Sequence, residues 1–61
     1  MEKLEDIVSR SIVEQSTLRC FLKYCKVYCG WTPYSQVDAD SVKTCLNNFK
    51  KDHPKQAQYV S

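Results

Sequence analysis

The first 29 residues contain neither glycine nor proline, the two residues that most often interrupt a helix. Helix is therefore the expected state for nearly half of the 61-residue chain, and apolar residues recur there at helical spacing. Ser16 and Thr17 break the apolar pattern, and both residue types prefer helix caps to helix interiors. The sequence predicts two helices, over about 3–14 and 17–29. One long bent helix over the same residues is the alternative.

A third helix is predicted over about 38–51. Apolar residues repeat there at positions i, i+3, i+4 and i+7: Val42, Cys45, Leu46 and Phe49. Gly30 suits the end of the preceding helix, and Pro54 disfavours helix at the residue before it. No segment favours a strand. We expect an all-α fold, a small three-helix module, with a single domain over 1–53 and a loose tail over 54–61.

The predicted core comes from the apolar faces of the second and third helices: Leu18, Phe21, Leu22, Val42, Leu46 and Phe49. A chain this short buries only about 60% of its unfolded surface, so a partner often adds stability. The first helix carries further apolar residues, namely Leu4, Ile7, Val8 and Ile12. Three short helices do not readily cover all of this surface, so we expect these four side chains to mediate self-association.

Three chemical states are open to the four cysteines. In a zinc site, Cys25 and Cys29 would lie one helical turn apart, with Cys45 and His53 completing a Cys3His set, although no C-x2-C knuckle is present. In a disulfide, Cys20 or Cys29 would meet Cys45 across two helices. Free buried thiols fit best, because the cysteines lie on the apolar stripes. We expect neither a metal nor a cofactor.

Catalysis has little support in the sequence. The single histidine, His53, lies beside a proline, and no glycine-rich phosphate loop or pair of carboxylates on an apolar face is present. A chain of this size also has difficulty building a pocket that excludes water. We expect a protein that is not an enzyme and has no small-molecule substrate.

Charge is unevenly distributed along the chain. Residues 1–15 carry four acids and two bases, a net charge of −2, whereas residues 16–61 carry three acids and seven bases, a net charge of +4. The predicted basic face comprises Arg19, Lys23, Lys26, Lys43, Lys50 and Lys51. Such a face suits an acidic membrane surface. Nucleic acid is a weaker candidate, although Tyr24 and Tyr28 could stack on bases beside these cations.

The sequence favours an intracellular protein, cytoplasmic or nuclear. No apolar run approaches the roughly 20 residues that span a bilayer. The acidic start of the chain differs from a secretory signal, and Glu2 replaces the glycine that N-myristoylation requires. The cysteines would be reduced in these compartments.

Two short patterns lie within residues 18–50. The first is Cys25-Lys26-Val27-Tyr28-Cys29-Gly30 followed by Thr32 and Ser35, and it resembles part of the matrix domain of alpharetroviral Gag proteins. The second is Phe21-Leu22 and Trp31-Thr32-Pro33, followed by Val37, Val42, Cys45 and Phe49, and it resembles part of the matrix domain of betaretroviral Gag proteins.

This resemblance implies a compact helical domain that brings a viral polyprotein to the inner membrane leaflet. The lysines that would face acidic lipid, at about 1 kcal/mol each, are Lys23, Lys26, Lys43, Lys50 and Lys51. The acidic first helix departs from the family's basic pattern.

Together these features predict a non-catalytic helical binding module for protein–protein interaction or self-association. The alternative is a matrix-like module that docks through its basic face on an acidic membrane or nucleic acid. Self-association should survive high salt, whereas electrostatic docking should be lost.

Overall fold

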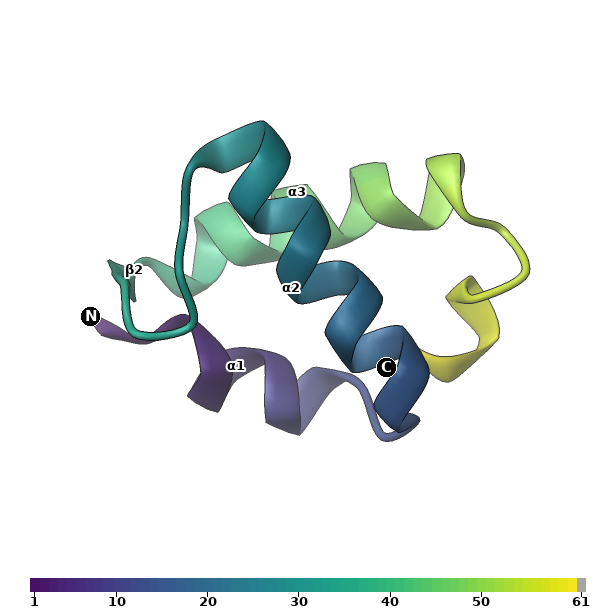
Figure 1. The fold of residues 1–61 in the computed structure, drawn as a ribbon, viewed down its shortest axis with the longest axis horizontal. Helices are drawn as coiled ribbons and strands as arrows, with labels where there is room; N and C mark the ends of the chain where they lie inside the picture. The colour runs from purple at the N-terminus through teal and green to yellow at the C-terminus, as the bar shows by residue number, and fades with distance from the viewer. Residues whose placement is uncertain (61) are drawn as a thin grey trace.

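A computed structural model describes residues 1–60 and contains three helices, a two-stranded sheet and a short 3-10 helix. The elements in chain order are β1 (Glu2–Lys3), α1 (Leu4–Ser11), α2 (Gln15–Cys29), β2 (Gln36–Val37), α3 (Ala39–Asp52) and η1 (Ala57–Tyr59). Each of the three helices packs against the other two, and α2 runs across α1 and α3 (Figure 1). The prediction of a small, mainly helical domain is therefore confirmed, with the sheet as an addition to it.

The expectation that no strand forms is wrong. β1 pairs with β2 in antiparallel orientation, which joins the start of the chain to the segment before α3. The next two N–H groups, of Leu4 and Glu5, donate to the carbonyls of Ser35 and Pro33 at 3.0 Å. The first N–H groups of a helix lack partners within it, so this segment satisfies the start of α1.

Residues 12–14 separate α1 from α2, so the prediction of two helices is confirmed and the single bent helix is excluded. The break lies slightly before the expected one, because Glu14 caps α2. Its carboxylate accepts hydrogen bonds from the N–H groups of Ser16, at 3.1 Å, and Thr17, at 2.7 Å, and from the Thr17 hydroxyl at 2.9 Å. These bonds stabilise the ionised form and lower the pKa of Glu14.

The predicted ends of α2 and α3 are confirmed. Gly30 adopts the left-handed conformation, with φ of 70°, and its N–H donates to the Lys26 carbonyl at 3.1 Å. The N–H of Trp31 reaches the Cys25 carbonyl at 3.3 Å, which completes a glycine C-cap. α3 ends at Asp52, one residue later than expected and two residues before Pro54.

The core lies where the three helices meet. Its buried apolar residues are Leu4, Ile7, Val8, Ile12, Phe21, Cys25, Val37, Val42, Cys45, Leu46 and Phe49. The rings of Phe21 and Phe49 pack edge to face at its centre, with centroids 5.2 Å apart. Of the six predicted core residues, four are buried, while Leu18 and Leu22 pack partly buried at the edge.

The segment after α3, which the sequence predicts to be a loose tail, contains the short helix η1. η1 packs against α3, and Val60 forms an isolated antiparallel bridge with Ile12. Val60 also packs partly buried against the core. Within the described residues, the segment after α3 therefore contacts the domain predicted over 1–53, and the boundary itself stays a prediction.

No helix within residues 1–60 is both long enough and apolar enough to cross a lipid bilayer.

Candidate functional site

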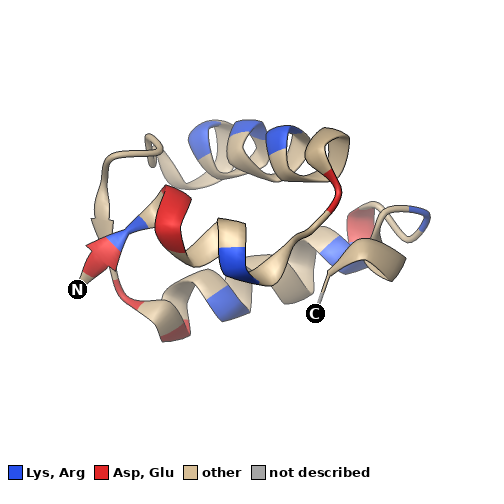
Figure 2. Cartoon of the chain, turned by 90° about the horizontal axis from the view of Figure 1, so that it is seen from below, with Lys and Arg blue, Asp and Glu red and all other residues tan. Residues whose placement is uncertain are grey.

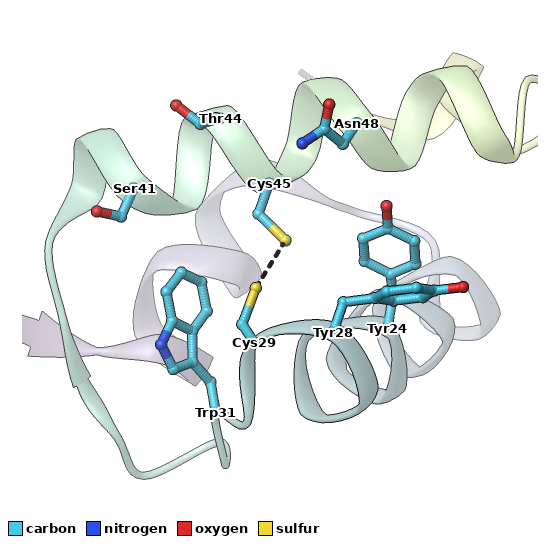
Figure 3. A pocket seen from close by; sticks show the side chains of 8 residues that line it. All are labelled: Tyr24, Tyr28, Cys29, Trp31, Ser41, Thr44, Cys45 and Asn48. Carbon is cyan, nitrogen blue, oxygen red and sulfur yellow. Dashed lines mark hydrogen bonds between the residues drawn. The ribbon is translucent and has the colours of Figure 1, made fainter.

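A groove of about 290 Å³ runs between α2 and α3 (Figure 3). Eight residues line it, and we call it the α2–α3 groove: Tyr24, Tyr28, Cys29, Trp31, Ser41, Thr44, Cys45 and Asn48. Aromatic rings stand on the α2 side, with the Trp31 ring beyond Cys29, and small polar side chains come from α3. Its volume lies at the lower limit for a small-molecule pocket.

Tyr24 anchors the aromatic side of the α2–α3 groove. Its hydroxyl donates to Oδ2 of Asp52 at 2.9 Å, and this bond raises the pKa of Tyr24 to about 12 because it stabilises the protonated phenol. The Tyr24 ring also packs edge to face on Phe49, at 5.4 Å between centroids. Tyr28 lies on Tyr24, with centroids 4.5 Å apart, so an exposed ring rests on a fixed one.

Three thiols meet between α2 and α3. Sγ of Cys45 lies 3.8 Å from Sγ of Cys25 and 3.7 Å from Sγ of Cys29. Cys25 and Cys45 are buried, and burial raises the pKa of both thiols, that of Cys45 to about 11. Cys29 is exposed at the end of α2 (Figure 3). The cluster therefore combines two protected thiols with one that solvent reaches.

The fourth member of the hypothetical zinc set lies elsewhere. The His53 ring packs against Phe49 and Tyr24, with centroids 4.9 Å and 6.0 Å apart, and it does not line the α2–α3 groove with Cys29 and Cys45. No group of three or more cysteine, histidine or acidic side chains within residues 1–60 has the arrangement of a metal site. Burial of two of the three thiols also opposes the thiolate form that zinc requires.

A second hollow, of about 530 Å³, brings together residues that are far apart in the sequence. It is lined by Cys20, Asp52, His53, Pro54, Lys55 and Gln56. A cysteine nucleophile activated by a histidine base, with an aspartate that orients the base, uses these three residue types. The sequence did not predict that they lie together, because their proximity depends on how α2 packs on α3. However, no hydrogen bond joins Cys20 to His53 among the described residues, and the Asp52 carboxylate accepts from Tyr24.

The six predicted basic-face residues do not share one surface. They are divided between α2 and α3, and Figure 2 shows the basic residues of α2 along the top of the view and those of α3 along the bottom. Lys43 lines a hollow between α1 and α3 together with Arg10, whereas Lys23 lines another beside Tyr28 and His53. The single ion pair within residues 1–60 joins Arg10 to Glu2 at 2.9 Å. The cations of α2 therefore have no acidic partner there.

The four side chains expected to mediate self-association are unavailable for it. Leu4, Ile7, Val8 and Ile12 are all buried, because α1 packs against α2 and α3, and Val37 and Val60 add to the same core. The exposed large apolar residues are instead Met1, Val13, Val27, Tyr28, Tyr34 and Tyr59. Val27 and Tyr28 are adjacent on α2, 66% and 71% exposed, and line one hollow with Lys23 and Tyr24. We call these four residues of α2 its outer face.

Comparison with protein families, with characterised proteins and with solved structures finds no match to this chain. The likeness to retroviral matrix domains therefore stays a prediction.

Proposed function

We propose that this chain is a non-catalytic helical binding module that associates with a second copy of itself through the outer face of α2. The observation that carries this proposal is the exposure of Val27 and Tyr28 on adjacent positions of one helix. Tyrosine is enriched at protein interfaces, where it contributes large area at little cost in conformational entropy. The support of Tyr28 by Tyr24 reduces that cost further, because the ring is already held by its neighbour.

The shape of the outer face supports a second copy as the partner. Tyr24 and Tyr28 line the α2–α3 groove on one side and a hollow of about 260 Å³ on the other, so they form a ridge between two depressions. A two-fold interface uses the same patch on both subunits and must be complementary to itself. A ridge beside a hollow meets this requirement, since the ridge of one copy fits the hollow of the other.

The charges of α2 predict how salt affects the association. A two-fold contact through the outer face brings the cations of the two α2 helices, Arg19, Lys23 and Lys26, near one another. None of the three has an acidic partner within residues 1–60 to offset their repulsion. Salt screens this repulsion, so the dimer should become tighter as salt increases.

Sedimentation equilibrium tests this proposal, with the full chain at concentrations up to about 1 mM. At that concentration, a dimer with a free energy of association of about 4 kcal/mol is half formed. We expect Tyr28→Glu to weaken the dimer by more than tenfold, or about 1.4 kcal/mol, because it places a charge at the centre of the contact. Tyr34→Glu is the matched control, since Tyr34 is 70% exposed but lies outside α2, and it should leave the dimer unchanged.

A wild-type chain that stays monomeric over this range would contradict the proposal. Equal weakening of the dimer by Tyr28→Glu and Tyr34→Glu would also contradict it, because the added negative charge, and not the position on the outer face, would then explain the loss.

The alternative function is electrostatic docking on an acidic membrane or nucleic acid. The observation that favours it is the row of unpaired cations along α2, namely Arg19, Lys23 and Lys26. Flotation with neutral and phosphatidylserine-rich vesicles separates the two functions, because docking weakens with salt whereas the proposed dimer tightens. Binding confined to acidic vesicles at low salt, from a chain that is monomeric in solution, would favour docking.

A further inference from the structure

Cys29 and Cys45 are placed to form a disulfide. Their sulfurs lie 3.7 Å apart, on two helices that pack against each other. A disulfide bond is about 2.05 Å long, so the two atoms must approach by less than the width of one atom. Both side chains line the α2–α3 groove, and Figure 3 shows their sulfurs facing one another across it.

Access decides which pair reacts. Cys25 lies almost as close to Cys45, with 3.8 Å between the sulfurs, but both of these thiols are buried, so no oxidant in solution reaches either one first. Cys29 is exposed, and its neighbour Cys45 is the thiol that can resolve an adduct formed there. Cys20 lines the separate hollow beside His53.

We propose that Cys29 and Cys45 are a redox-sensitive pair, in which Cys29 reacts with a low-molecular-weight disulfide and Cys45 completes an intramolecular disulfide. The Cys29 thiolate attacks a sulfur of glutathione disulfide, which forms a mixed disulfide and releases one glutathione thiolate. Cys45 loses its proton to solvent and attacks the Cys29 sulfur, which releases the second glutathione. The two protein thiols are oxidised, and glutathione disulfide is reduced to two glutathione molecules.

The bond would join the last turn of α2 to the middle of α3 and fix the width of the α2–α3 groove. It would also close a loop that contains β2. Because a cross-link restricts the unfolded chain, oxidation should raise the melting temperature. Excess reduced glutathione should break the disulfide and return the melting temperature to its original value. The bond forms within one chain and does not require self-association.

The sequence allows a direct assignment of the bond, because trypsin places each cysteine on its own peptide. These peptides are 20–23, 24–26, 27–43 and 44–50. The native full chain is incubated with glutathione disulfide, quenched with acid, alkylated and digested. We expect peptides 27–43 and 44–50 to be recovered as one linked species that is two hydrogens lighter than their sum, with the other two cysteines alkylated.

Matched variants test the order of the two steps. Cys29→Ser should slow the loss of thiols by about tenfold or more, because the exposed nucleophile is gone. Cys45→Ser should stop at a stable mixed disulfide on Cys29. Cys20→Ser is the control and should leave the rate and the linked peptides unchanged. Far-ultraviolet circular dichroism of each variant verifies that the helices are intact.

Two results would overturn the proposal. One is a first linked species that contains peptide 20–23 or 24–26. The other is a native chain that yields the same mixture of pairings as a chain oxidised in urea, since the native contacts would then have no influence on the reaction.

Discussion

Tyr24 shows how much one side chain contributes to this small domain. It contacts the core through Phe49, supports the exposed ring of Tyr28 and donates its hydroxyl proton to Asp52. The last of these contacts links α2 to the end of α3. Nothing in the helical pattern indicates it, because the two residues are 28 positions apart and their contact depends on tertiary packing.

The hydrogen bond to Asp52 should make stability depend on alkaline pH. The pKa of Tyr24 is raised from 10.0 to about 12 in the folded chain, so above pH 10 the unfolded chain loses this proton first. The stabilising contribution is therefore complete below pH 10 and is lost as the pH rises towards 12. Urea unfolding between pH 8 and pH 11, compared with Tyr24→Phe, should show a steeper loss of stability in the wild type.

Absorbance near the tyrosinate maximum provides the control. The difference between the wild type and Tyr24→Phe isolates the titration of Tyr24, and Asp52→Asn should move it to lower pH because the anionic acceptor is gone. A Tyr24 titration that does not respond to Asp52→Asn would contradict this account.

At the scale of the elements, the helix boundaries follow the strength of the local signals. Gly30 and Pro54 stop their helices close to where the sequence predicts, because each residue acts through its own backbone. The start of α2 differs from the prediction because glutamate is not a preferred N-cap residue. Ser16 and Thr17 are of types that favour the cap position, so the sequence predicts a start at about residue 17. Strands of two residues are too short for any alternating pattern to appear.

Gly30 gives a direct test of the α2 terminus. Nothing lies within 4 Å of a Cβ placed at this position, so Gly30→Ala costs only the strain of a left-handed backbone. We expect a loss of about 1 kcal/mol of unfolding free energy, measured by urea titration. Gly30→Asn should cost less, because asparagine tolerates this conformation better than alanine. A stability ranking with alanine above asparagine would refute the role of the backbone.

For the whole molecule, the packing of α1 departs most from what the sequence predicts. The apolar stripe of α1 appeared to exceed what three helices can cover, yet Val37 of β2 and Val60 lie against the same core. Neither contact has a local signal, because one comes from a two-residue strand and the other from a segment without periodicity. The candidate site was predictable only in part: the sequence identified the two tyrosines and the cysteines, including Cys45 of α3, but not the polar residues that α3 adds to the groove, Ser41, Thr44 and Asn48.

A pair of valine substitutions measures what the C-terminal segment contributes. Val60→Asp should lower the unfolding free energy by about 1 kcal/mol, because Val60 covers Ile12 and the apolar contact is lost. In a domain of this size that corresponds to a fall of roughly 4–8 °C in melting temperature. Val13→Asp is the matched control, since Val13 is 82% exposed, and should shift the melting temperature little. Equal shifts would show that the segment contributes nothing.

The two ends of α1 are both held by residues that a ribosome makes much later. Its first N–H groups depend on the carbonyls of Pro33 and Ser35, and the residue after its last turn pairs with Val60. During synthesis α1 therefore emerges before the segments that hold its two ends. The contacts at both ends of α1 can form only after residues 33–35 and Val60 have been synthesised, long after the residues of α1 itself.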